Sequence, residues 1–171
     1  MKMLTIALAM TFALLGQPQQ QQQDEKPRHI PERKFQLKDL QVEEIKLGKD
    51  LEHKMKVWVM DMEAKRQEGL MFVLDGDIKQ DQGMIFVFKD AQLLSFWMKN
   101  TYIPLDIAYL DANGKIVMTY TMRELDIYSD YGSRFPAKYA LEMKKGTMTR
   151  LGLKAGQKIQ IPDKVKAKDD L

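Results

Sequence analysis

The chain has 171 residues, of which 44% are apolar and 30% are charged, and its formal net charge is +3. This length and apolar content suit a single domain with its own core, and the intermixed charges form no concentrated basic stripe, so we expect no nucleic-acid partner. The absence of cysteine from the sequence excludes thiol nucleophiles, disulfides and cysteine-bound metals.

The N-terminus has the pattern of a targeting segment. Lys2 is followed by an uncharged, almost wholly apolar stretch, residues 3–15, and then by the small residue Gly16. This length suits the core of a signal peptide and is too short for an ordinary membrane span. We expect a signal peptide over residues 1–16, no other membrane span, and export to the periplasm or the extracellular space. A short uncleaved anchor is the alternative.

Composition divides the rest of the chain into three parts. Residues 17–33 are rich in glutamine and have too few apolar side chains to order themselves, so we expect a disordered linker. Apolar content then rises, which predicts one domain over residues 34–162. Residues 163–171 read as a polar tail. We expect the protein to be a monomer.

Short apolar runs between turn signals predict strands. In chain order they cover residues 45–47, 56–61, 84–88, 93–99, 105–110, 115–121, 138–143 and 158–161. The charged run 63–71 predicts a short helix that ends near Gly69, and residues 147–151 predict a helical turn. Asn113-Gly114 indicates a hairpin. Together these elements predict a mainly β domain, a compact antiparallel sandwich or barrel-like fold with one or two short helices.

The segment 95–111, SFWMKNTYIPLDIAYLD, places polar side chains inside an apolar and aromatic stretch, namely Lys99, Asn100, Thr101 and Asp106. A buried polar group without a partner costs about 1–3 kcal/mol. The cluster is therefore either a hydrogen-bonded knot or a functional site. Because Asp106 follows Thr101 so closely, we expect its carboxylate to accept hydrogen bonds from residues 99–101.

Glu142 supplies a second carboxylate. If its strand lies beside the strand of Asp106, alternation along strands would allow Lys99, Asp106 and Glu142 to converge. Two carboxylates beside a lysine can separate their pKa values and perform acid–base catalysis. A structural ion pair is the alternative.

The aromatic side chains near Trp97 have two interpretations. Trp97, Phe96, Tyr102 and Tyr109 could form a stacking platform for a sugar or another flat ligand. Aromatic side chains more often bury their large area, and we expect this run to be core.

Residues 122–135 form a long predicted loop that contains Arg123 and Ser133 as candidate binding residues. An ordered binding loop and a flexible surface loop are both consistent with its length. Its acidic residues lack the spacing of a calcium loop, and only two histidines occur in the chain, so we expect no metal and no other cofactor.

Four motifs resemble the uncharacterised family known as domain of unknown function 192. They are Gly69-Leu70-Met71, Gly83-Met84-Ile85-Phe86, residues 96–101 with Pro104-Leu105-Asp106, and Pro136-Ala137 with Tyr139, Leu141-Glu142 and Gly146. The resemblance covers residues 55–161. It implies a compact, mainly β domain that is often exported, and it implies no reaction. In this family the helix motif commonly continues to an arginine, where this chain has Val73, and a closing Gly-Asp is Gly156-Gln157 here.

These observations lead to three hypotheses. The first is an exported β module that binds a small ligand, an envelope component or a protein through the residues Trp97, Lys99, Asn100, Thr101, Asp106, Arg123, Ser133 and Glu142. The second is an enzyme that acts on a glycan or another envelope substrate. Asp106 and Glu142 would be its acid and base, and Lys99 or Arg123 would hold an anion. The third is a structural envelope protein.

Overall fold

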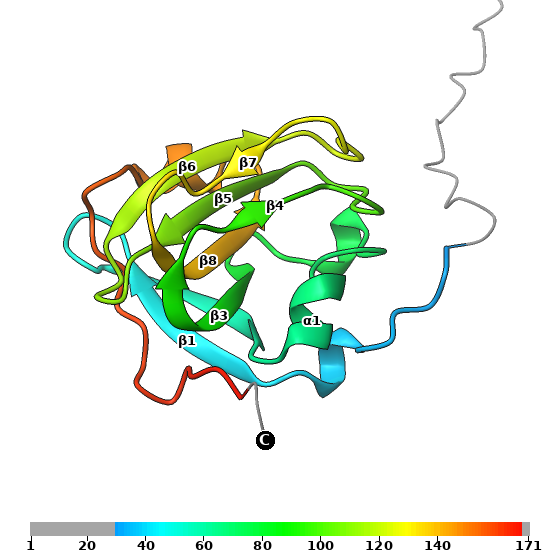
Figure 1. The fold of residues 1–171 in the computed structure, drawn as a ribbon, viewed down its shortest axis with the longest axis horizontal. Helices are drawn as coiled ribbons and strands as arrows, with labels where there is room; N and C mark the ends of the chain where they lie inside the picture. The colour runs from blue at the N-terminus through cyan, green and yellow to red at the C-terminus, as the bar shows by residue number, and fades with distance from the viewer. Residues whose placement is uncertain (1–29, 169–171) are drawn as a thin grey trace, which may run out of the picture. The chain divides into compact units, whose positions relative to one another are not determined.

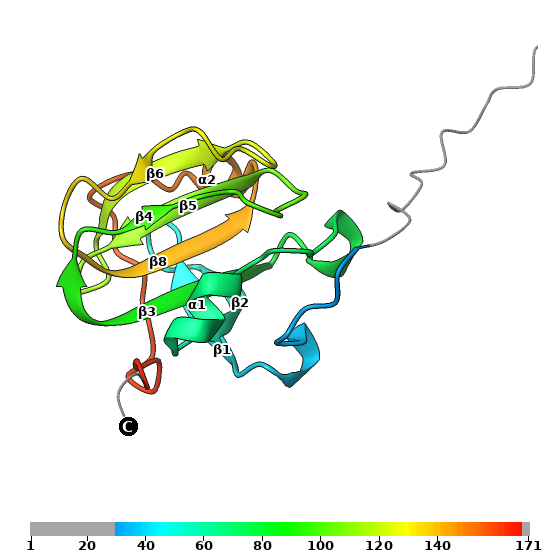
Figure 2. The ribbon, with the colours of Figure 1, turned by 45° about the vertical axis from the view of Figure 1, so that its right-hand side comes forward.

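The computed structural model of the protein describes residues 30–168, so the expected signal peptide and most of the expected linker lie outside the described residues. The main sheet has the strand order β1-β2-β3-β8-β5-β6 (Figure 1, with β2 labelled in Figure 2). These strands are β1 (Val42–Leu47), β2 (His53–Met60), β3 (Gln82–Gln92), β8 (Ala137–Lys144), β5 (Leu105–Leu110) and β6 (Ile116–Met122). A second, two-stranded sheet pairs β4 (Ser95–Phe96) with β7 (Tyr131–Gly132).

Two α-helices and two short 3-10 helices complete the fold. They are α1 (Glu63–Glu68), α2 (Thr147–Leu151), η1 (Leu37–Asp39) and η2 (Asp75–Asp77). Helix α1 and η2 lie in the connection between β2 and β3. That connection is long enough to bring the chain back to the end of the sheet at which β2 begins, and β2 and β3 therefore run parallel.

The predicted mainly β class is confirmed, and the main sheet is open rather than a closed barrel. The sheet is mixed rather than purely antiparallel, because β2 and β3 run parallel while its other strand pairs are antiparallel. The predicted strand over 105–110 matches β5, and the predicted helix does end before Gly69.

Two predicted strands are much shorter than expected. Only Ser95–Phe96 of residues 93–99 is a strand, because a turn follows in which Thr101 bonds back to the carbonyl of Met98. Residues 158–161 form two isolated bridges, Lys46 with Gln160 and Lys115 with Lys158. Residues 95–96 pair outside the main sheet, and residues 158–161 bridge β1 and the residue before β6.

Side chains alternate across the main sheet and form a separate core on each face. On one face, here called the α1-side core, Met84, Phe86, Ile107, Tyr109 and Ala140 pack with residues that follow α1 and with the β4 and β7 segments. The opposite face, the α2-side core, contains Ile85, Ala108, Leu141 and Met143 packed against α2 and the C-terminal segment. Helix α1 lies over β2 (Figure 2).

Gly83 allows β3 and β8 to approach each other closely. A Cβ atom at this position would lie 2.7 Å from the carbonyl oxygen of Glu142. Any other residue would push the two central strands apart. The close packing of β3 against β8 therefore explains why the motif begins with glycine.

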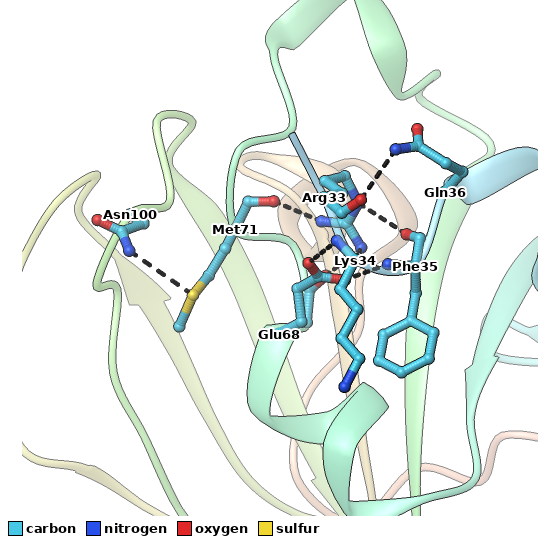
Figure 3. Close-up of polar contacts among 8 residues, drawn as sticks. Arg33, Lys34, Phe35, Gln36, Glu68, Met71 and Asn100 are labelled. Carbon is cyan, nitrogen blue, oxygen red and sulfur yellow. Dashed lines mark hydrogen bonds and ion pairs between the residues drawn. The ribbon is translucent and has the colours of Figure 1, made fainter. Parts of the chain in front are cut away.

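The segment before β1 is attached to the end of α1 by Arg33 (Figure 3). The Arg33 guanidinium donates hydrogen bonds to the carbonyls of Gly69, at 2.8 Å, and Met71, and its Nη2 lies 3.5 Å from the Glu68 carboxylate. Glu68 in turn accepts hydrogen bonds from the backbone amides of Lys34 and Phe35. Arg33, which we expected at the end of the linker, therefore fixes the position of α1.

The described part of the predicted polar tail also packs against the domain. Val165 is buried in the α2-side core. Lys168 Nζ lies 2.6 Å from Asp61 Oδ2, just after the end of β2. The C-terminal segment is therefore attached to the domain by burial of Val165 and by an ion pair with Asp61.

We predict that Arg33→Met lowers the free energy of unfolding by about 2 kcal/mol, because hydrogen bonds from a charged group are lost and two carbonyls lose their donor. Urea unfolding measures this loss, and Lys38→Met, at an exposed position of η1, is the control. Equal unfolding midpoints for the two variants would contradict the role given to Arg33.

Candidate functional site

A pocket of about 540 Å³ opens on the α1 side of the main sheet. One wall consists of α1 and the residues up to Met71, and the opposite wall of residues 95–97 and Thr101. Phe86 and Phe88 of β3 and Glu142 of β8 line the pocket between these walls. We call this space the Glu142 pocket.

Strand register places Glu142 in the pocket. In the sheet it stands between Met84 of β3 and Ile107 of β5, both of which are in the α1-side core. Its neighbours Leu141 and Met143 point to the opposite face. The side chain of Glu142 therefore leaves the sheet on the pocket side.

The carboxyl group of Glu142 is buried and has no partner. Glu142 is 4% exposed, and among the described residues none hydrogen-bonds or ion-pairs with its side chain. Burial away from water raises its pKa to about 8. At neutral pH the carboxyl is therefore mostly protonated, with hydrogen-bonding capacity that the fold leaves unused.

The other charged side chains of the pocket wall have opposite charges beside them. Arg66 Nη2 donates to Glu63 at 2.9 Å, and its Nη1 donates to the carbonyl of Val87 at 2.9 Å. The Arg66 guanidinium also lies 4.8 Å from the centre of the Phe88 ring. Glu68 is held by Arg33, as described above.

Aromatic rings form much of the remaining wall. Phe96 meets Phe86 edge to face, with ring centres 4.8 Å apart. Trp97 stands at the mouth and is 54% exposed, and Lys99 Nζ lies 5.1 Å from the centre of its ring. The expectation that Trp97 is core is wrong. Side chains alternate along this segment, so Phe96 and Met98 point into the α1-side core and Trp97 points outward.

The two walls are joined at one end. The backbone amide of Phe72 donates to the carbonyl of Asn100 at 2.8 Å, and Asn100 Nδ2 lies 3.9 Å from Met71 Sδ (Figure 3). Asn100 adopts a left-handed φ of 56°, a conformation that asparagine accepts more readily than most residues. These contacts fix the wall that carries Trp97 to the turn that follows α1.

Asp106 does not join Glu142. It lies opposite Met143, so its side chain points into the α2 side of the sheet. There its carboxylate accepts hydrogen bonds from Thr121 Oγ1 at 2.8 Å and from the amide of Met148 in α2 at 2.9 Å. The expected convergence of Lys99, Asp106 and Glu142 is wrong, and so is the expected bonding of Asp106 to residues 99–101. The two carboxylates are on neighbouring strands but on opposite faces.

Arg123 and Ser133 are not among the residues that line the Glu142 pocket. Ser133 accepts a hydrogen bond from the amide of Leu94 and donates one to the carbonyl of Phe135. Arg123 pairs with Asp126, which also accepts bonds from Ser129 and from the Tyr131 hydroxyl. These donors hold the Asp126 pKa well below its usual range. The loop over 122–135 is therefore an ordered turn built on Asp126.

The structure thus brings Trp97, Thr101 and Glu142 to one pocket, with Lys99 and Asn100 beside it. Sequence reasoning missed Arg66, Phe86 and Phe88. Arg66 lies in a short charged run that reads as a solvated helix face, and the two phenylalanines read as core. Of these three residues, only Phe86 carried a signal in the sequence, because it belongs to the family motif Gly83-Met84-Ile85-Phe86.

The fold and the pocket define a mainly β domain with a ligand-sized hollow against an open mixed sheet. The chain belongs to the family described as "Uncharacterized ACR", domain of unknown function 192, whose model matches residues 44–161. The two departures from the family pattern have local structural roles here. Val73 is buried in the α1-side core, and Gln157 accepts a hydrogen bond from the amide of Lys154.

Two solved structures are similar to this chain. A protein from Sinorhizobium meliloti 1021, described as a proposed transcription regulator, is 29% identical, with a TM-score of 0.65 over 71% of this chain and 94% of that one. A protein of unknown function from Novosphingobium aromaticivorans DSM 12444 is 26% identical, with a TM-score of 0.68 over 74% and 90%. Among curated proteins, no relative matches.

Between residues 30 and 168, no helix has the length and apolar character needed to cross a membrane. The same part of the chain contains no group of three or more histidine, aspartate or glutamate side chains placed to hold a metal ion.

We predict that Trp97→Ala lowers the free energy of unfolding by less than about 1 kcal/mol, because an exposed ring loses little buried area and one cation–π contact. Phe96→Ala is the matched comparison and should cost at least about 2 kcal/mol, since it empties part of the core. Chemical denaturation compares the two variants. A larger loss for Trp97→Ala than for Phe96→Ala would contradict the assignment of Trp97 to the pocket mouth.

Proposed function

We propose that this protein is an exported binding module that holds a small ligand in the Glu142 pocket. The observation that carries the proposal is the buried carboxyl of Glu142, which faces a ligand-sized space without a partner. Ligand sites in proteins commonly combine apolar and aromatic walls with a few polar groups that orient the ligand.

The energetics favour a functional reason for this carboxyl. A buried polar group without a hydrogen bond costs about 1–3 kcal/mol, and a leucine or methionine at this position would avoid that loss. Buried ionisable groups with shifted pKa values that face clefts are candidates for functional sites. A bound ligand that hydrogen-bonds to Glu142 would remove the penalty.

The walls of the pocket suit a binding role because they are fixed before a ligand arrives. Arg33 and Glu68 hold α1, and the contact between Phe72 and Asn100 holds the opposite wall. A preformed site spends less binding free energy on ordering side chains and loops. Trp97 at the mouth adds an exposed aromatic face on which a flat group can stack.

Export remains part of the proposal. It rests on Lys2 and the apolar stretch of residues 3–15. N-terminal sequencing of the protein recovered from the producing cell tests it, and finding Met1 at the N-terminus would count against a cleaved signal peptide.

The enzyme hypothesis has less support. Acid–base chemistry with Asp106 and Glu142 needs both carboxylates at one substrate, and the sheet separates them. The Asp106 carboxylate moreover already accepts hydrogen bonds from the Thr121 hydroxyl and from the backbone amide of Met148. We therefore do not assign this pair a reaction.

Two variants separate binding from stability. Glu142→Gln should fold and lose affinity for fragments that shift the NMR signals of Met71 and Trp97. Asp106→Asn should lose stability, because its bonds to Thr121 and Met148 weaken, but should keep the affinity for those fragments. A fragment screen by NMR on the wild-type protein supplies the probes. Failure of every fragment to shift pocket signals would contradict the proposal.

The pH dependence of stability provides a further check on Glu142. Its pKa rises from about 4.5 to about 8 on folding, so the folded protein retains a proton that the unfolded chain releases between these values. Wild-type stability contributed by Glu142 is full below about pH 4.5 and falls as pH rises toward 8. Glu142→Gln lacks this loss and should gain relative stability from pH 5 to pH 8 in urea unfolding. A constant difference would argue against a buried carboxyl.

A further inference from the structure

We infer that the ligand of the Glu142 pocket is an organic cation, a small molecule in which a protonated amine adjoins an apolar group. This inference rests on the proposed function and specifies its ligand class. It follows from the charge balance of the pocket, from the aromatic walls and from the lack of a partner for Glu142.

The charge balance points to a missing positive charge. Three carboxyl groups line the pocket, those of Glu63, Glu68 and Glu142. Glu63 pairs with Arg66 and Glu68 pairs with Arg33. Glu142 alone among them has no cation beside it in the described part of the chain. A ligand that supplies an ammonium group completes the third pair.

The aromatic walls reinforce this assignment, because the face of an aromatic ring attracts cations. Two rings of the pocket already bind cations of the protein itself. The Arg66 guanidinium lies over Phe88, and Lys99 Nζ lies over Trp97, with distances to the ring centres of 4.8 Å and 5.1 Å. Phe86 and Phe96 provide further apolar surface for the uncharged part of the ligand.

Arg66 does not turn the pocket into an anion site. Its guanidinium is already bonded to Glu63 and to the carbonyl of Val87. The other titratable groups around Glu142 are Glu63 and Glu68 on α1 and Tyr109 on β5, whose hydroxyl donates to the carbonyl of Tyr131. None of these groups is a cation, and Lys99, beside the pocket mouth, holds its Nζ over the Trp97 ring.

Binding of such a ligand releases one proton. In the free protein at neutral pH the Glu142 carboxyl is mostly protonated, since its pKa is about 8. When the ammonium ion enters, Glu142 becomes a carboxylate, its proton passes to solvent, and the ion pair forms in its place. The apparent affinity then rises up to tenfold per pH unit below about pH 8 and levels off above it. An aliphatic ammonium group stays charged in this range, since its pKa is near 10.

The test uses three molecules of similar size that differ in charge: phenethylamine, phenethyl alcohol and 3-phenylpropionate. Isothermal titration calorimetry at pH 6, 7 and 8, in two buffers of different ionisation enthalpy, measures their affinities and the protons released. We expect phenethylamine to bind most tightly, about 50-fold more tightly at pH 8 than at pH 6, with close to one proton released at pH 7.

Glu142→Gln should abolish the pH dependence and the preference for the amine. Asp106→Asn, on the opposite face, and Asp39→Asn, at an exposed site of η1 that leaves the fold untouched, should keep both. If the alcohol or the propionate binds the pocket as tightly as the amine, the cation inference is wrong and the proposed function stands. The cation inference is also wrong, and the proposed function again stands, if none of the three binds while other fragments shift pocket signals. If no fragment binds the pocket, both are wrong.

Discussion

The register of β8 between β3 and β5 is the constraint on which the rest of the structure depends. It sends Leu141 and Met143 into the α2-side core and turns Glu142 to the α1 side. Because side chains alternate along a strand, a slip of one residue would exchange these faces and put Leu141 in the pocket. Gly83 supports the register by allowing β3 to lie close against the backbone at Glu142.

Around this central strand, contacts between distant parts of the chain build the pocket. Arg33 comes from before the first strand and holds the end of α1, and the turn at Asn100 is bonded to Phe72. None of these contacts touches the carboxyl of Glu142. Their common effect is to hold two walls apart at a fixed separation, so that the space above Glu142 persists and does not collapse onto it.

The carboxylates illustrate how the same chemical group takes different roles on the two faces of one sheet. Asp106 meets a hydroxyl donor and a backbone amide of α2, and so its burial is compensated by hydrogen bonds. Glu142 faces the aromatic-lined pocket without a hydrogen-bond partner among the described residues, and burial raises its pKa to about 8. Local environment, and not residue identity, separates a structural carboxylate from a candidate binding group.

The sequence by itself determined the mainly β class, the place of β5 and of the short helix, and the family to which the chain belongs. Those features rest on local patterns, namely the alternation of apolar residues, turn residues and closely spaced motifs. Only the tertiary structure decided that Trp97 is exposed, that Arg33 holds α1, and that Asp106 and Glu142 lie on opposite faces. Alternation shows which residues of one strand share a face, but not how that face aligns with the next strand. That alignment is set by hydrogen-bond register between segments far apart in the chain, which no local pattern encodes.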